Sequence, residues 1–83
     1  MQKQLALLAA RGRTVQSAFE DLQKQQQAQG LSPRLDMTTS LERMKQFLDG
    51  AHDALGGGKI DEAKDAMESA EREIAKLEKF LGR

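Results

Sequence analysis

The sequence predicts an all-α fold, with a long amphipathic N-terminal helix followed by an antiparallel helical hairpin. Apolar residues recur at spacings of three and four in three separate stretches, which is the period of a helix and not of a strand. Segments containing glycine or proline separate these stretches, so we expect helices over 1–29, 40–55 and 59–82 and a linker over 30–39. Residues 1–83 then form one small helical module, which we expect to be a fragment or terminal region of a larger protein.

Composition excludes several classes of protein. The 83 residues contain no cysteine, which excludes a disulfide framework and a thiolate metal site. Thirteen Lys and Arg balance thirteen Asp and Glu, so the whole chain has no net field that attracts nucleic acid or an anionic membrane. The charge is nevertheless divided, because 1–34 carries five basic and two acidic residues whereas 35–83 carries eight basic and eleven acidic ones. The two parts should therefore attract one another, within one chain or between two.

The first predicted helix, 1–29, carries an apolar stripe that follows a coiled-coil heptad. Positions a and d hold Leu5, Leu8, Gly12, Val15, Phe19 and Leu22. Gly12 interrupts the stripe, and Gly30 stands where a glycine commonly ends a helix. The absence of acidic residues before Glu20 also fits an organelle-targeting peptide or a shortened secretory signal, and this alternative stays open.

The linker, 30–39, is expected to be irregular because Pro33 lacks a backbone donor and disfavours helix at the residue before it. Three apolar side chains should hold it against the hairpin, namely Leu31, Leu35 and Met37. Thr39 and Glu42 form a capping-box pattern, which predicts that the second helix begins near Ser40.

The second predicted helix, 40–55, has a stripe of five apolar residues. These are Leu41, Met44, Leu48, Ala51 and Leu55. Gly50 lies inside the helix beside Ala51 and Ala54, and we interpret the three as a patch of small residues where the third helix approaches closely. A hinge at Gly50 is the alternative interpretation.

The third predicted helix, 59–82, has the clearest stripe in the chain. It comprises Ile60, Ala63, Met67, Ala70, Ile74, Leu77 and Leu81. Three glycines at 56–58 predict a tight antiparallel turn before it, and Asp61 and Glu62 place negative charge in its first turn, as the helix dipole favours. Charged residues on its outer face include pairs such as Glu73 and Lys76, which we interpret as solvated.

The hairpin also resembles a single tetratricopeptide repeat over residues 47–70. The packing positions of the second half of the repeat are matched by Gly58, Ile60, Ala63, Met67 and Ala70. The first half departs from the pattern, since Gly50 stands where the repeat has leucine and Ala54 where it has an aromatic residue. The resemblance implies a tetratricopeptide-like hairpin, without the superhelix that needs several copies. Residues 72–83 are similar to the helical tails of multidomain bacterial signalling proteins such as serine/threonine kinases.

No pattern in the sequence predicts catalysis, a cofactor or a metal site. His52 is the only histidine, and Asp49 and Asp53 beside it are too few for a transition-metal site without ligands from another chain. The Gly-Gly-Gly-Lys run at 56–59 is followed by Ile60 and lacks the spacing of a phosphate loop. The carboxylates alternate with basic residues on outward faces, whereas acid–base catalysis needs a desolvated one. We therefore predict that the chain is not an enzyme and has no small-molecule substrate.

The unequal lengths of the predicted helices indicate a function. At 1.5 Å per residue the first and third helices would run about 40 and 33 Å and the second about 23 Å, so the second cannot cover both of the other stripes. Some apolar surface is left for another protein, and we predict an interaction or oligomerisation module, most simply a homodimer. The predicted interaction residues are Leu5, Leu8, Val15, Phe19, Leu22, Ile74, Leu77 and Leu81.

Two alternatives to self-association follow from the same residues. An adaptor module would use these stripes to bind an amphipathic helix or peptide of another protein. A nucleic-acid accessory role would use four basic residues of the first helix, Lys3, Arg11, Arg13 and Lys24. The longest apolar run, at 5–10, is far shorter than the roughly 20 residues that span a membrane, so we expect no membrane insertion within this chain, and a cytoplasmic location is favoured.

Overall fold

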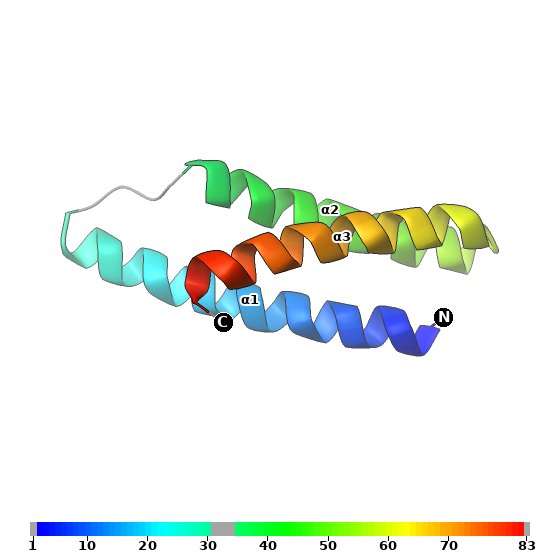
Figure 1. Ribbon diagram of the computed structural model, residues 1–83, viewed down its shortest axis with the longest axis horizontal. Coiled ribbons are helices and arrows are strands. Elements are labelled where there is room, and N and C mark those ends of the chain that lie inside the picture. Colours follow the sequence, from blue (N-terminus) through cyan, green and yellow to red (C-terminus); the bar gives the residue numbers. More distant parts are fainter. Residues whose placement is uncertain (1, 31–34, 83) are drawn as a thin grey trace.

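The computed structural model describes residues 2–30 and 35–82, apart from the side chain of Leu35, and this part of the chain forms three α-helices. They are α1 (Gln2–Ala28), α2 (Leu35–Gly56) and α3 (Ile60–Leu81). The hairpin of α2 and α3 is antiparallel, and α1 lies along it, antiparallel to α2 and parallel to α3 (Figure 1). The bundle measures 47 × 19 × 17 Å. The predicted all-α fold is confirmed, and the predicted ends of the first and third helices are each within one residue.

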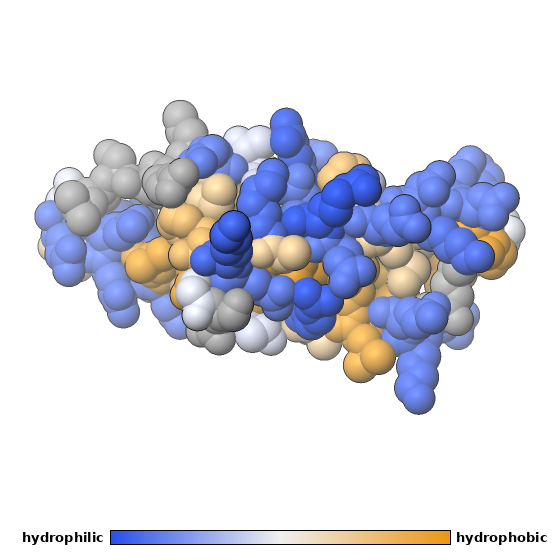
Figure 2. All heavy atoms as spheres, in the orientation of Figure 1, coloured by the Kyte–Doolittle hydropathy of each residue, from blue (hydrophilic) through white to orange (hydrophobic). Residues whose placement is uncertain are grey.

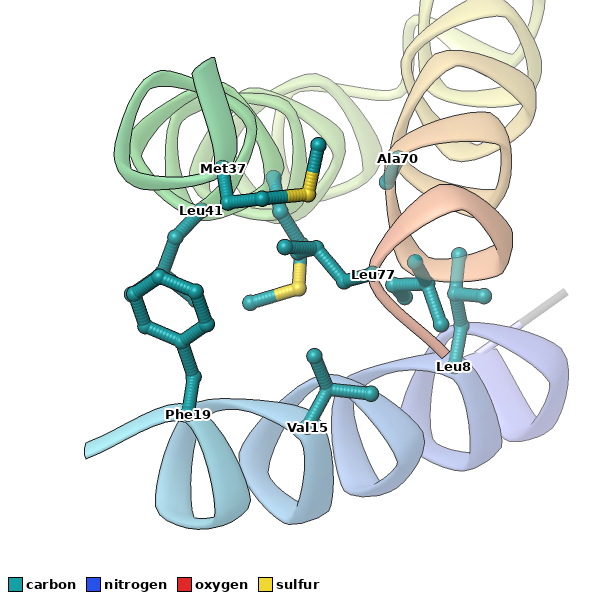
Figure 3. Close-up of a cluster of buried hydrophobic side chains, with 9 residues drawn as sticks. Leu8, Val15, Phe19, Met37, Leu41, Ala70 and Leu77 are labelled. Carbon is teal, nitrogen blue, oxygen red and sulfur yellow. The ribbon is translucent and has the colours of Figure 1, made fainter. Parts of the chain in front are cut away.

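All three helices contribute side chains to one hydrophobic core. Figure 3 shows Val15 and Phe19 of α1 pointing into the space between the helices, toward Leu41 of α2 and Leu77 of α3. The core cluster comprises Leu8, Val15, Phe19, Met37, Leu41, Met44, Ala70, Ile74 and Leu77. Burial of a large apolar side chain stabilises a fold by about 1.5–3 kcal/mol. The stripe of α1 is therefore covered by the hairpin of its own chain.

Glycines in the left-handed conformation end α1 and the hairpin turn. Gly30 has a φ of +76°, and its N–H donates a hydrogen bond to the carbonyl oxygen of Gln27 at 3.0 Å. Gly58 has a φ of +75°, and the next amide, of Lys59, donates to the carbonyl oxygen of Ala54 at 2.8 Å. The helix stop at Gly30 and the tight turn between α2 and α3 are confirmed.

The start of α2 differs from the prediction. The helix begins at Leu35, so Thr39 lies inside it and is not an N-cap, and the predicted capping box is wrong. Met37, Ser40 and Leu41 are all buried at helical spacing, so the inner face of α2 already reaches the core before the predicted cap. Burial of this face outweighs the local capping signal. The predicted irregular connection and the contacts of Leu31 and Leu35 fall outside the described residues and side chains.

The close approach of two helices occurs at Gly12 and not at Gly50. A Cβ atom at Gly50 would meet nothing within 4 Å, so the predicted small-residue contact with α3 is wrong at this glycine. Gly12, which was expected only to interrupt the stripe of the first helix, is buried, and a Cβ there would lie 3.0 Å from Cδ1 of Leu48 and 3.5 Å from Sδ of Met44. The missing side chain at Gly12 therefore lets α1 pack closely on α2.

One residue of the predicted α3 stripe is not covered. Ala63 and Ala70 are fully buried, but Ile60 is 45% exposed, and Met67 is half-buried. Ile60 is the first residue of α3, and because α1 runs parallel to α3, it lies near the start of α1, where little of α1 can cover it. Two of the positions that matched the tetratricopeptide repeat thus pack inside and a third does not, and the resemblance stays a prediction.

Matched substitutions at the two glycines should have opposite effects on stability. Gly12→Leu places a side chain against Leu48 and Met44, and we expect this overpacking to lower the free energy of unfolding by about 1–3 kcal/mol. Gly50→Leu adds a good helix former in open space and should raise it by about 0.5–1 kcal/mol. Urea unfolding followed by circular dichroism measures both values. Destabilisation of similar size at both positions would contradict the packing described for Gly12.

Two residues of the same α3 stripe should differ sharply when truncated. Leu77 is fully buried, so Leu77→Ala should lower the free energy of unfolding by about 2–5 kcal/mol. Ile60→Ala removes a side chain that is 45% exposed and should cost less than about 1 kcal/mol. The same urea unfolding measurement compares them. A large loss for Ile60→Ala would mean that this residue is covered in solution.

Candidate functional site

A shallow groove lies between the N-terminal half of α1 and α3. Its volume is about 460 Å³, and it is lined by Gln4, Leu7, Leu8, Arg11, Lys64, Met67, Glu68 and Glu71. Each helix contributes residues at positions i, i+3, i+4 and i+7, so the groove follows one face of two parallel helices for two turns, or about 10 Å. Figure 2 shows the same side of the molecule as Figure 1, with hydrophobic surface interrupted by hydrophilic side chains. The groove therefore has an apolar floor and a charged rim.

Leu7 is the residue that makes the groove unusual. Its side chain is 62% exposed, whereas the neighbouring Leu8 is buried in the core and Met67 is half-buried on the facing helix. Leu7 lies at position c of the heptad, so it was not among the interaction residues predicted from positions a and d. The signal was present: Leu7 lies about 200° around a helix from Leu5 and 100° from Leu8, so the three leucines cannot share one narrow stripe.

Arg11 closes one end of the groove and joins α1 to α3. Its guanidinium donates a hydrogen bond of 2.8 Å from Nη2 to Oε1 of Glu78 and one of 3.2 Å from Nη1 to Oε1 of Glu71. These two bonds, that of Glu78 first, raise the pKa of Arg11 despite the opposing effect of partial desolvation. Because the bridge pairs residues far apart in the sequence, it sets the position of α1 along α3.

The structure places most of the predicted interaction residues inside the bundle. Six of the eight are buried within the single chain, namely Leu5, Leu8, Val15, Phe19, Ile74 and Leu77. Leu22 and Leu81 are half-buried. These six residues are inaccessible because α1 packs on the hairpin of its own chain. The sequence left open whether α1 packs on its own hairpin or on that of a second chain. Among the described side chains, the large hydrophobic ones that are exposed are Leu7 and Ile60.

The C-terminal end of α3 packs on α1 at the edge of the core, where the half-buried Phe80 contacts the buried Phe19. The ring centroids of Phe19 and Phe80 are 6.2 Å apart at an interplanar angle of 48°, an arrangement that aromatic pairs favour. Leu22 and Leu81 are half-buried as well. This contact holds the C-terminal end of α3 against the middle of α1, so the last turns of α1 extend past the hairpin (Figure 1).

The charges on the outer face of α3 are not all solvated as predicted. Glu73 is only 8% exposed, beside the buried Ala70 and Leu77, so the solvated interpretation of the Glu73 and Lys76 pair is wrong for Glu73. Nζ of Lys76 lies 3.6 Å from Oε2 of Glu73, and that oxygen has no hydrogen-bond partner in the described part of the chain. By helical register Glu73 faces inward, so the aliphatic stem of Glu73 contributes to packing while Lys76 lies near the Glu73 carboxylate.

The described part of the chain offers no group of three His, Asp or Glu side chains placed to hold a metal ion. His52 is exposed, and it borders a separate hollow between α1 and α2 with Leu5 and Leu55. Among residues 2–30 and 35–82, no helix has an apolar stretch sufficient to cross a membrane.

Comparison with known proteins gives no match to this chain among protein families, curated proteins or solved structures. The function is therefore argued from the groove, the charges on its rim and the packing of the helices around it.

The Arg11 bridge should contribute modestly to stability, and salt should weaken it. Arg11→Gln removes both ion pairs across α1 and α3, and because the arginine is partly exposed we expect a loss of up to about 1 kcal/mol in the free energy of unfolding. The loss should shrink in high salt, which screens exposed charges. Thermal unfolding at two salt concentrations measures this, with Arg13→Gln, an exposed arginine outside the groove, as the control. Equal losses for the two variants would contradict a specific bridge.

Proposed function

We propose that this chain is a non-catalytic protein–protein interaction and oligomerisation module whose contact surface is the groove between α1 and α3. The observation that carries the proposal is the exposure of Leu7, at 62%, beside Met67 in a concave surface. A single exposed leucine is ordinary on a protein surface. An exposed leucine on the wall of an apolar groove with a charged rim is typical of a surface that another protein covers.

The shape of the groove favours a helix as its occupant. Two parallel helices that each present an i, i+3, i+4, i+7 row form a channel into which a third helix fits by inserting its own apolar side chains. An added helix would cover Leu7 and Met67 and would give a four-helix arrangement, in which every helix has its apolar stripe covered. The order of preference is therefore self-association first and binding of an amphipathic helix of another protein second.

The charges on the groove support a protein partner over nucleic acid. Arg11, one of the four basic residues in the first helix, is hydrogen-bonded to Glu71 and Glu78 and is neutralised by them. Glu68 and Glu71 line the same groove as Lys64, so its rim has charges of both signs. A phosphate backbone is bound by clustered basic side chains, and acidic groups on the rim would repel it. Mixed charges suit the polar rim of a protein interface.

Replacement of Leu7 by a small polar residue should remove the function without unfolding the chain. Leu7→Ser loses the apolar anchor of the groove but changes an exposed side chain, so the helical circular dichroism signal and melting temperature should stay close to wild type. We expect wild-type protein either to self-associate at high micromolar concentration in sedimentation velocity or, as a monomer, to bind a hydrophobic fluorescent dye. Leu7→Ser should weaken whichever signal occurs several-fold.

The matched control is Ser17→Ala, an exposed residue of α1 that does not line the groove. This variant should behave as wild type in both measurements. A wild-type chain that neither associates nor binds the dye would contradict the proposed function. A Leu7→Ser variant that retains both properties would show that the groove is not the contact surface.

A further inference from the structure

We infer that the occupant of the groove is α1 of a second copy of this chain, which runs antiparallel to the first α1 and is related to it by a two-fold axis that crosses both helices beside Leu7. The inference deepens the proposed function and rests on it, since it names the partner of the same groove. It is carried by the charges on α1 and α3, by the direction in which these helices run, and by the positions of Leu7 and Ile60, which are the exposed large hydrophobic residues of the described part of the chain.

The first observation is the complementary charge of α1 and α3. From residue 2 to residue 19, α1 carries three basic residues and no acidic one. α3 carries seven acidic and four basic residues, a net charge of −3. Within one chain Arg11 already pairs with Glu71 and Glu78 across the two helices. The segment of this chain best matched in charge to α3, and already able to pack beside it, is therefore another copy of α1.

The second observation is the direction of the helices. α1 and α3 run parallel, and because Arg11 bonds to both Glu71 and Glu78, it lies level with the stretch of α3 between these two residues. A second α1 in parallel orientation and in register would set each basic residue beside its own copy. An antiparallel α1 centred on Leu7 instead brings Lys3 of the second copy level with Arg11, where the two carboxylates of Glu71 and Glu78 outnumber the one guanidinium, and this favours the antiparallel arrangement. In the antiparallel orientation the dipole of the added helix also points opposite to the parallel dipoles of α1 and α3, which is electrostatically favourable.

The third observation is that a two-fold arrangement covers the exposed hydrophobic surface of both copies. In such a dimer each chain inserts Leu7 into the groove of the other, beside Met67. The same surface of each chain then supplies both the inserted side chain and the groove that receives it. Ile60 precedes Lys64 by four residues and Met67 by seven, which places it on the groove side of α3. Both large side chains found exposed, Leu7 at 62% and Ile60 at 45%, then border one interface.

Cysteine cross-linking tests this geometry directly, because the chain has no cysteine of its own. Leu7→Cys should form a disulfide-linked dimer within minutes of mild oxidation, since the two-fold axis brings the two Leu7 positions together. Ser17→Cys, exposed on α1 but outside the groove, should cross-link at least ten-fold more slowly. Equal rates for the two variants would overturn the inferred two-fold contact.

A charge reversal tests the antiparallel register. Lys3→Glu should weaken dimerisation about five-fold in sedimentation equilibrium, because it places an acidic side chain beside Glu71 and Glu78 of the other copy in two symmetric positions. Lys24→Glu makes the same charge change at an exposed position of α1 far from Leu7, and its affinity should stay close to wild type. Equal losses for the two variants would overturn the register.

The outcomes separate this inference from the proposed function. Wild-type protein that stays monomeric at high micromolar concentration, yet binds the hydrophobic dye in a Leu7-dependent way, would overturn the second copy as occupant and leave the groove as a site for a different helix. A dimer that Leu7→Ser does not weaken and Leu7→Cys does not cross-link would overturn both, because association would then use another surface. A dimer that cross-links through position 7 and is weakened by Lys3→Glu but not by Lys24→Glu supports both.

Discussion

The covering of the hairpin by α1 is the interaction on which the rest of this structure depends. A hairpin of two short helices leaves the apolar faces of Leu41 and Leu77 open to water, and Val15 and Phe19 of α1 close that face. Gly12 allows α1 to come this close, because a Cβ atom there would lie only 3.0 Å from Cδ1 of Leu48. A domain of this size buries few side chains, so the contacts between α1 and the hairpin decide whether the chain folds as a unit.

The same packing leaves a specific surface uncovered. A third helix placed on a hairpin can bury one face of its neighbours, and the channel between the two parallel helices stays open on the side away from α2. Leu7 and Met67 lie in this channel, and Arg11 closes it by bonding to Glu71 and Glu78. The interaction surface is thus a consequence of how the core is built. Met67 belongs to the stripe of α3, where Ala63 and Ala70 on either side of it are buried, whereas Leu7 lies outside the stripe of α1.

The elements predicted correctly are those whose signals are local. The ends of the first and third helices follow from Gly30 and from the glycine turn before Ile60, because a left-handed backbone there needs no information from elsewhere in the chain. The second helix shows the limit of local signals. Thr39 and Glu42 fit the capping-box pattern well, yet α2 begins earlier, at Leu35, because Met37 is buried against residues distant in the sequence. Packing contacts between helices therefore outweigh the local capping preference within one helix.

The sequence by itself determined that this chain is helical and where two of its helices end, since period and glycine position are properties of short stretches. Only the tertiary structure decided that α1 packs on its own hairpin, that Gly12 and not Gly50 is the point of close approach, and that Leu7 remains exposed in a groove. These features depend on which residues of different helices lie level with one another. That register is set by packing and by bridges such as Arg11 with Glu78, between residues that no local pattern connects.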